Sequence, residues 1–493
     1  MISGTIDTIR IRATKELNQS KRAELGQFLT PSVIAKFMAG LFQKDCNTPI
    51  HLLDAGAGVG SLTAAFLDRK LNGWNTNQNI QITAYEIDSI LLPYLKKNIS
   101  TYRNLLSKET IVLKENLLNL DFIEDAILKI KDNNSKVFTH AILNPPYKKI
   151  NSASQHRFLL SSIGFETVNL YTAFVALSLM LLQDNGELVA IIPRSFCNGN
   201  YYKSFRNLIT QNAAIKHIHL FESRTQAFKE DDVLQENIII HLVKAAPQGK
   251  VTISRSTNES LNDFTESSYP YEQIVKPDDS EAFIHIPNLK ENRLENSDAI
   301  AFTLSDLGVE VSTGPVVDFR VKEHLFMEPE KGTIPLLYPN HFNGKELDWP
   351  KQSKKPNSIA LNLETQKMFY PSGFYTLVRR FSSKEEKQRV VARVVNPEML
   401  KSKFIGIENH LNVFHSAKKG IAEDLAYGIA AYLNSSFVDI HFRSFSGHTQ
   451  VNATDLRQMK YPCKNELIKL GKWAKKFKTF EQIKIDEQLT KIL

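Results

Sequence analysis

The residues with the clearest chemical potential are Asn144, Pro145, Pro146 and Tyr147, which follow the apolar stretch 137–143. A β-branched and aromatic stretch ended by two prolines, which cannot continue a strand ladder, predicts a buried strand that stops at a turn. The two prolines would keep this turn stiff, and Pro145 removes a competing backbone N–H. The turn therefore presents an amide and an aromatic ring together at the edge of a predicted sheet.

This combination suits the methylation of an amino nitrogen on an aromatic base. The Asn144 side-chain oxygen and the Pro145 carbonyl could accept both N–H groups, which would localise the nitrogen lone pair and make it a better nucleophile. Tyr147 adds a flat face on which an unpaired base could stack, a contact worth roughly 1–3 kcal/mol. The alternative interpretation is a proline turn beside a buried tyrosine.

A strand followed by a glycine-rich turn lies at residues 50–60, and the turn begins with Asp54 and Ala55. Glycines at positions 56, 58 and 60 would let the backbone approach a ligand closely. Their alternation departs from the dinucleotide fingerprint, although a dinucleotide remains an alternative. A carboxylate at Asp54 would repel a pyrophosphate and suits an ammonium group, such as that of S-adenosylmethionine.

The strand predicted over residues 80–88 carries Glu86 near its end, which could accept both hydroxyls of a ribose, while Ile87 could lie on an adenine ring. A third strand, predicted over residues 110–114, leads to Asn116. Glu86 and Ile87 would lie at the carboxyl edge of the predicted sheet, where open α/β sheets bind their ligands. They predict a nucleoside-binding site there.

Thr30 and Pro31 start a predicted helix that follows a loop with Gly26 and Phe28. A loop that delivers these residues to a helix N-terminus could hold a carboxylate, because unpaired N–H groups point there. The alternative is simply a capped helix.

Strands and helices alternate through the first half of the chain, which predicts an α/β fold with a doubly wound, mainly parallel sheet. A polar segment at 150–165 is a candidate loop over the site. The later predicted elements are a helix at 169–182, a strand at 187–192, a helix at 198–206, and strands at 215–221 and 236–243.

The order GQFLTP, DAGAGVG, YEID, NPPY, NLYTAF, PRSF resembles the γ-class N6-adenine DNA methyltransferases of type II restriction-modification systems, and more narrowly their PstI/BsuBI branch. The resemblance covers roughly residues 12–244. It implies the Rossmann-like fold of class I S-adenosylmethionine-dependent methyltransferases, with S-adenosylmethionine as cofactor and no metal. It also implies an adenine flipped out of double-stranded DNA, and a cognate restriction endonuclease that acts on the same site without necessarily binding the enzyme.

The resemblance also implies roles for individual residues. Thr30 would contact the methionine end of the cofactor, Glu86 its ribose, and Ile87 and Phe174 its adenine. Tyr202 is the preferred second stacking partner of the flipped base, and Phe196 is the second choice. Asn116 stands where relatives often carry an aspartate for the adenine amino group, or it is a loop asparagine making local bonds. The full cofactor set is Thr30, Asp54, Ala55, Gly56, Gly58, Glu86, Ile87, Asn116, Asn144 and Phe174.

The second half of the chain differs in character. Residues 246–300 are polar and turn-rich and predict a connecting region, which would separate a catalytic domain at 1–245 from a mixed α+β DNA-recognition domain at 301–493. The stretch 467–478 has an apolar and a basic face, so it could pack on that domain or lie on a membrane, and we favour the former.

Polar loops and basic residues in this domain are candidates for DNA contacts. Arginine, lysine, histidine, glutamine and asparagine can each reach a phosphate or a base edge. The candidate residues are Arg379, Arg380, Lys384, Arg389, His448, Gln450 and Asn452, with Lys387 and Arg393 as further phosphate contacts.

Length and composition agree with a protein of two or three domains. The 493 residues carry a net charge of +8, which favours a polyanionic partner. The three cysteines show no zinc or disulfide spacing, and no signal peptide or membrane span is recognisable, so we expect a cytoplasmic monomer or weak dimer. Two other functions remain open: methylation of RNA bases or protein glutamine, and a non-catalytic DNA-binding module with a decayed methylase fold.

Overall fold

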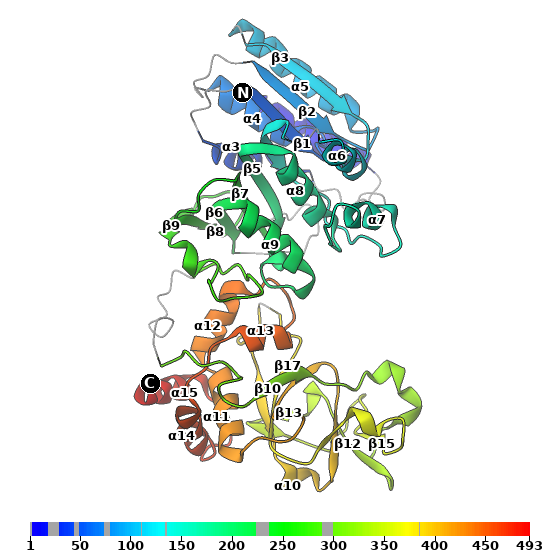
Figure 1. The fold of residues 1–493 in the computed structure, drawn as a ribbon, viewed down its shortest axis with the longest axis vertical. Helices are drawn as coiled ribbons and strands as arrows, with labels where there is room; N and C mark the ends of the chain where they lie inside the picture. Colours follow the sequence, from blue (N-terminus) through cyan, green and yellow to red (C-terminus); the bar gives the residue numbers. More distant parts are fainter. Residues whose placement is uncertain are drawn as a thin grey trace. The chain divides into compact units, whose positions relative to one another are not determined.

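The chain forms two compact units, residues 1–287 and 288–493 (Figure 1). The computed structural model describes residues 2–17, 29–43, 49–72, 79–109, 111–133, 136–222, 236–287, 299–383 and 385–493. Of the residues that the sequence singles out, Gly26, Phe28 and Lys384 lie outside these ranges.

The first unit is built on a nine-stranded sheet with the order β3-β2-β1-β4-β5-β7-β6-β8-β9. The strand pairs from β3 to β5 are parallel, as predicted. Strand β7 runs antiparallel to both of its neighbours, and β9 runs antiparallel to its single neighbour. The strands are β1 Ile50–Ala55, β2 Ile80–Tyr85, β3 Leu113–Leu118, β4 Phe138–Leu143, β5 Leu182–Pro193, β6 Ala213–Phe221, β7 Asn237–Lys244, β8 Val251–Ser256 and β9 Thr265–Tyr269.

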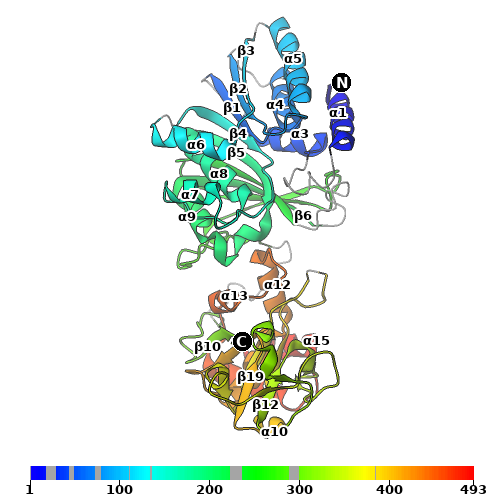
Figure 2. The ribbon, with the colours of Figure 1, turned by 90° about the vertical axis from the view of Figure 1, so that its right-hand side faces the viewer.

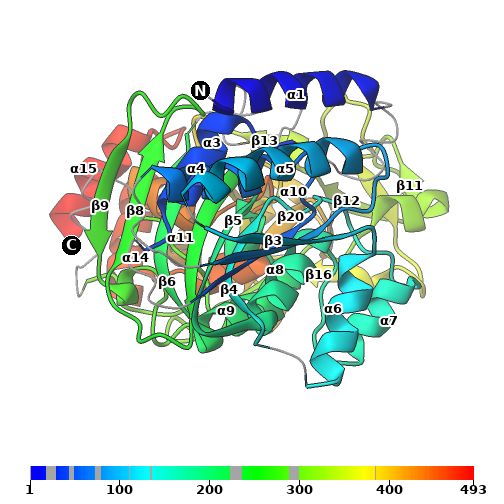
Figure 3. The ribbon, with the colours of Figure 1, turned by 90° about the horizontal axis from the view of Figure 1, so that it is seen from above.

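Helices cover both faces of this sheet (Figures 2 and 3). One layer consists of α1 Ile2–Glu16, α3 Ser32–Gly40, α4 Ser61–Leu71 and α5 Leu92–Lys108, and the other of α6 Phe122–Lys131, α8 Leu170–Leu181 and α9 Lys203–Asn212, with α7 Gln155–Ser161 against α6. Each layer has its own apolar core against the sheet. Because both faces are covered, a central strand such as β4 is buried along its whole length.

The boundary between the units differs from the prediction. Residues 246–287 belong to the first unit, because β8 pairs with β6 and β9 pairs with β8 at the edge of the large sheet. The buried Arg206 of α9 donates hydrogen bonds to the carbonyls of Phe196, Gly199 and Glu281. This segment is therefore tied to the loop that follows β5 and is no linker.

The second unit has a mixed α+β fold, as predicted, with sheets of four, five and two strands. Its strands are β10 Glu310–Thr313, β11 Leu325–Phe326, β12 Thr333–Leu337, β13 Phe342–Asn343, β14 Glu346–Leu347, β15 Ser358–Ala360, β16 Phe369–Pro371, β17 Tyr375–Arg379, β18 Ala392–Val395, β19 Phe404–Ile407 and β20 Leu411–His415. Its helices are α10 Pro397–Leu400, α11 Glu423–Leu433, α12 Ser436–Phe445, α13 Ala453–Gln458, α14 Lys464–Ala474 and α15 Gln482–Ile492.

The amphipathic stretch near the end of the chain packs on its own unit. Helix α14 crosses α11 so closely that a Cβ built on Gly428 would lie 1.9 Å from the carbonyl oxygen of Leu467. Leu467, Leu470 and Ala474 are buried in this contact. No helix among the described residues is long and apolar enough to cross a membrane.

Candidate active site

A cavity of about 360 Å³ opens where β1, β2 and β4 end at their carboxyl edge in the first unit. Its walls combine the glycine turn, the residues after β2, the turn after β4 and the start of α8. The lining residues are Leu29, Gly56, Gly58, Tyr85, Glu86, Ile87, Leu91, Leu120, Asp121, Phe122, Asn144, Pro146, Lys148, Lys149, Ile150, Asn151, Ser154, His156, Leu170 and Phe174.

Strand β4 delivers the Asn-Pro-Pro-Tyr turn to this cavity. The half-buried Asn144 donates from Nδ2 to the Thr30 hydroxyl at 2.9 Å, and its Oδ1 accepts from the Tyr147 hydroxyl at 3.1 Å. The Tyr147 hydroxyl also lies 3.1 Å from the carbonyl oxygen of Ile191. The amide is thus held at both ends beside the cavity. Its oxygen and nitrogen are placed in distinct surroundings.

Thr30 does not cap the helix that it precedes. Pro31 occupies the N-cap position of α3, and the first N–H group of the helix, that of Ser32, donates to Asp7 Oδ1 at 3.1 Å. Thr30 is only 4% exposed, and the structure instead joins its hydroxyl to Asn144. The simpler interpretation of this threonine as a helix cap is therefore wrong.

The end of β1 carries a buried carboxylate directly before the glycine turn. Asp54 is fully buried, and its Oδ2 accepts a 2.6 Å hydrogen bond from the Thr63 hydroxyl. Within the described part of the chain, Asp54 Oδ1 has no hydrogen-bond partner. Burial raises the pKa of Asp54 to about 7, and hydrogen bonds from Thr63 oppose this shift. A positively charged ligand group would remove the cost of ionising this residue.

A second, smaller hollow of about 20 Å³ adjoins the cavity at the N-terminus of α4. Thr30, Ala57, Gly58, Ser61 and Asn144 are among its lining residues. Ser61 is 6% exposed, and its hydroxyl oxygen has no hydrogen-bond partner in the described structure. The sequence did not single out Ser61, because a serine that starts a helix has an ordinary structural explanation.

The residues after β2 form another part of the cavity wall. Glu86 is 4% exposed and accepts 2.7 Å hydrogen bonds from the backbone N–H groups of Gly58 and Asp88. Burial raises the pKa of Glu86 to about 7, although these two donors oppose the shift. Ile87 is 56% exposed and lines the cavity beside Phe174, as expected for an apolar platform.

The position of Asn116 contradicts its predicted role. Asn116 lies inside β3, paired with Thr83 of β2, and is not among the residues that line the cavity. The strand continues to Leu118, and the side chain of the following Asn119 donates to the carbonyls of Glu86 and Ile87. The cavity wall beyond this point is formed by residues that the sequence analysis missed.

Asp121 is the carboxylate that reaches the cavity after β3. Its Oδ1 caps α6 by accepting from the N–H groups of Ile123 and Glu124, and its Oδ2 lies 3.0 Å from Nε2 of His156. Burial raises the pKa of Asp121, but the His156 contact and the backbone donors outweigh it, so the pKa lies below its usual value. The signal in the sequence was an acidic residue directly before an apolar helical stripe.

The polar segment predicted as a loop over the site includes a short helix. This helix is α7, whose N-cap Ser154 accepts a hydrogen bond from the N–H of Arg157. Asn151, Ser154 and His156 line the cavity. The hydrogen bond to Asp121 raises the pKa of His156 above its usual value and joins α7 to α6.

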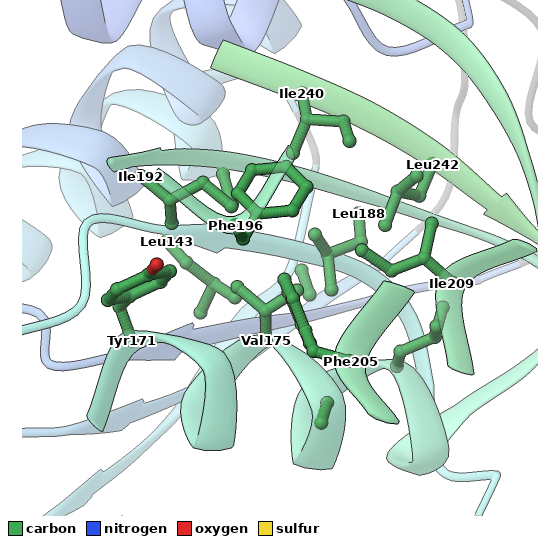
Figure 4. Close-up of a cluster of buried hydrophobic side chains, with 14 of the residues drawn as sticks. Leu143, Tyr171, Val175, Leu188, Ile192, Phe196, Phe205, Ile209, Ile240 and Leu242 are labelled. Carbon is green, nitrogen blue, oxygen red and sulfur yellow. The ribbon is translucent and has the colours of Figure 1, made fainter. Parts of the chain in front are cut away.

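The two aromatic candidates for base stacking differ in accessibility. Phe196 is fully buried, with its ring 5.3 Å from that of Phe205 in the core shown in Figure 4, so it cannot stack on a base in this structure. Tyr202 is 9% exposed, its hydroxyl accepts from Asn169, and its ring lies 5.9 Å from that of Tyr171. Its role stays a prediction. The neighbouring Tyr201 is 76% exposed.

Arg389 is not available for DNA. It is fully buried, donates from Nε to the Ser382 hydroxyl at 3.0 Å, and lies 5.3 Å from the ring centre of Phe442. Its prediction as a DNA contact is therefore wrong. Its neighbours in the structure come from segments far apart in the sequence. The burial of Arg389 therefore cannot be predicted from the residues next to it in the chain.

The other candidate DNA residues have partial structural roles. Arg379 pairs with Glu386, and Arg380 donates to the carbonyl of Asn409 at 2.8 Å. Asn452 caps α13. Gln450 forms a backbone bridge with Phe381, and the carbonyl of His448 accepts from Arg389. Their contacts with DNA stay predictions.

The first unit has the doubly wound, Rossmann-like α/β fold that the sequence predicts: a mainly parallel central sheet between helical layers, with a glycine turn after β1 and an acidic residue after β2. A similar overall structure is the type IIL restriction-modification enzyme MmeI, determined in complex with DNA. Its TM-score is 0.55 at 12% identity, with 98% of this chain and 74% of that chain covered.

Sequence comparison gives the family. Residues 54–228 match the Eco57I restriction-modification methylase family. The chain is 49% identical to the type II methyltransferase M.BsuBI of Bacillus subtilis over 99% of its length and 97% of that protein. It is 41% identical to M.PstI of Providencia stuartii over 99% of its length and 96% of that protein. The chain belongs to this family of type II restriction-modification methyltransferases.

Proposed function

We propose that the protein is a site-specific DNA adenine N6-methyltransferase that uses S-adenosylmethionine. The observation that carries this proposal is the Asn144 amide, held at the end of β4 beside a cavity that also contains Glu86. Family membership and the net charge of +8 support DNA as the substrate. Methylation would protect the site from a cognate restriction endonuclease.

The residues of the cavity fit this cofactor. Glu86 offers carboxylate oxygens to a ribose, and Ile87 and Phe174 offer apolar surface to an adenine. Asp54 Oδ1 and Ser61 Oγ, which have no partners in the described structure, suit the ammonium and carboxylate of an amino acid. Asp121 takes the place proposed for Asn116 as the acceptor for the adenine amino group. When bound, the cofactor supplies an electrophilic methyl group on its sulfonium.

The chemistry assigned to the protein is orientation and polarisation of the target amine. Asn144 Oδ1 and the Pro145 carbonyl would accept the two N–H groups, so that the nitrogen lone pair turns out of the ring toward the methyl carbon. Transfer would break the bond between the methyl carbon and the sulfonium sulfur, which leaves as a neutral thioether, and the methylated nitrogen would lose its proton to solvent, because both acceptors are neutral groups that do not take it. Tyr147 would stack on the flipped base.

The second unit would read the DNA sequence, and its remaining described candidates for contacts are Arg379, Arg380, His448, Gln450 and Asn452, with Lys387 and Arg393 as further phosphate contacts. Lys384 stays a candidate outside the described residues. A monomer would suffice, because each strand of a site can be methylated in a separate event.

Methyl-labelled S-adenosylmethionine distinguishes this function from its rivals. The protein is incubated separately with bacterial genomic DNA, with RNA and with a protein extract, and the products are digested and identified by mass spectrometry. We expect label only in DNA, as N6-methyladenine. Label in RNA or in glutamine would replace the proposed substrate, and failure to bind the donor would favour a decayed fold.

A substitution tests the role of the amide. Asn144→Ala should reduce methyl transfer at least 10²-fold, the order of effect of removing one preorganised polar partner, while donor binding measured by calorimetry stays within about twofold. Asn116→Ala is the matched control, because Asn116 lies in β3 and does not line the cavity. Activity retained by Asn144→Ala would remove Asn144 from the mechanism.

A further inference from the structure

We infer that Thr30 couples the filling of the hollow at the N-terminus of α4 to the orientation of the Asn144 amide. This makes Thr30 a positioning residue for methyl transfer, in addition to any contact with the donor. The inference rests on the proposed function, because it concerns which end of the amide faces the target amine. The ligand group concerned is the carboxylate of the amino acid moiety of the donor.

The hollow has the features of a carboxylate site. Helix α4 spans 11 residues, and its N-cap Gly60 provides no side-chain hydrogen bond to the first turn. The first N–H groups of a helix lack intrahelical partners and attract anions. The buried Ser61 hydroxyl adds an unpartnered donor in the same hollow. Thr30 lines the same hollow and contacts Asn144.

Hydroxyl protons decide the orientation of the amide. A hydroxyl has one proton and can either donate or accept toward a neighbour. Thr30 could therefore accept from Asn144 Nδ2, or donate to Oδ1 if the amide turned over. Tyr147 permits both arrangements as well, because its single proton can go to Asn144 Oδ1 or to the carbonyl of Ile191, each 3.1 Å away.

A carboxylate in the hollow removes this ambiguity. Because it only accepts, it takes the Thr30 proton, and Thr30 can then only accept from Asn144 Nδ2. This is the arrangement in the structure, where Nδ2 donates to Thr30 at 2.9 Å. Oδ1 is left on the side of Tyr147, facing the place proposed for the amine. The reversed amide would meet the amine with its own N–H groups and oppose the reaction.

The side-chain amide signals of Asn144 report this coupling without DNA. The protein is labelled with ¹⁵N in asparagine, and the Asn144 signals are assigned by their loss in Asn144→Ala. S-adenosylhomocysteine carries the carboxylate, whereas 5′-methylthioadenosine has the same nucleoside thioether without it. We expect a change in the Asn144 signals with S-adenosylhomocysteine that 5′-methylthioadenosine does not reproduce.

Two variants separate the hydroxyl from the shape of the side chain. Thr30→Ser keeps the hydroxyl and should keep the difference between the two ligands, whereas Thr30→Val keeps the shape and should lose it. An equal response of Thr30→Val and the unmodified protein would overturn the inference, as would equal effects of the two ligands. Calorimetry confirms that each ligand is bound, and absence of S-adenosylhomocysteine binding would count against the proposed function itself.

Kinetics provide the second readout. At saturating donor and genomic DNA, Thr30→Val should lower kcat about tenfold, the effect of one misplaced hydrogen bond, and Thr30→Ser should restore it to within about threefold. A residue that only binds the donor would raise KM and leave kcat unchanged. That result in Thr30→Val would refute the positioning role while leaving the methyltransferase function intact.

Discussion

Replacement of Asp54 by asparagine should stabilise the protein without ligand and weaken its binding of the donor. Asp54 is fully buried, and burial raises its pKa from 3.8 to about 7. The folded protein therefore keeps this proton to a higher pH than the unfolded chain does. As the pH rises from 3.8 toward 7, the unfolded state binds fewer protons than the folded state, and the free energy of unfolding decreases.

The pKa shift sets the size of the effect. A difference of about 3 pH units, at 1.36 kcal/mol per unit, corresponds to an upper limit of about 4 kcal/mol, which is fully lost above pH 7. About half of this contribution to the free energy of unfolding, or roughly 2 kcal/mol, is lost between pH 5.5 and 8. Asparagine has no charge to bury, and its amide oxygen can still accept from the Thr63 hydroxyl that lies 2.6 Å from Asp54.

Thermal unfolding of both proteins across this pH range is the assay. The Tm of Asp54→Asn minus that of the unmodified protein should increase with pH by several degrees and level off above pH 7. The subtraction removes most of the contribution of Glu86, whose pKa is raised in the same direction. A difference that is independent of pH, or one that falls as pH rises, would refute the reasoning.

Burial favours the protonated form of Asp54 in the protein without ligand, whereas ligand binding should favour the ionised form. The ammonium group of S-adenosylhomocysteine would favour ionised Asp54, so binding near pH 7 should release protons, seen as a dependence of the calorimetric heat on the buffer. Asp54→Asn should bind at least tenfold more weakly and lose this proton release. Unchanged affinity would show that Asp54 does not face the amino group of the ligand.

Three further substitutions test other parts of the structure. Asp121→Ala should weaken S-adenosylhomocysteine binding about tenfold in calorimetry, whereas Asn116→Ala should not, and the reverse result would restore Asn116 to the site. Arg389→Met should destabilise the protein by roughly 1–3 kcal/mol in thermal unfolding without changing the salt dependence of DNA binding; a shallower salt dependence would show a phosphate contact. Gly428→Ala should cost roughly 1–3 kcal/mol, because its methyl group would collide with the Leu467 carbonyl, and an unchanged Tm would contradict this close crossing.

The parts of the site formed by central strands were predictable from sequence. Strand β4 is buried on both faces, so its residues form a continuous apolar run that ends visibly at Asn144 and the prolines. The glycine turn after Asp54 and the acidic Glu86 after β2 are local signals of the same kind. Each depends on neighbours in the sequence, and Gly56, Glu86 and Asn144 line the cavity.

Asn116 was misplaced because β3 is the edge strand of the sheet. An edge strand needs less apolar sequence, and β3 carries Lys114, Glu115 and Asn116 within it, so its end was not visible as a change in polarity. The apolar Ile111 and Val112 shifted the predicted strand toward the N-terminus. Asp121 was missed as a consequence of this boundary error.

Tertiary contacts explain the remaining differences. Whether Phe196 faces a base or the core depends on Phe205 and the rest of the apolar cluster, and whether Arg389 reaches solvent depends on Ser382 and Phe442. Residues 246–287 contain polar turns and short strands whose partner strand lies elsewhere in the chain. None of these pairings follows from a local pattern.

The hydrogen bonds of Arg206 limit where the chain can be divided. A fragment that stops at residue 245 would lack the Glu281 carbonyl that receives one of these bonds, and β6 would lose the neighbour that covers its outer edge. Burying a guanidinium group that lacks a hydrogen-bond acceptor costs free energy of folding. Such a fragment should therefore be unstable, even though it contains every proposed catalytic side chain. Chimaeras that exchange recognition halves between relatives should therefore be joined after Pro287.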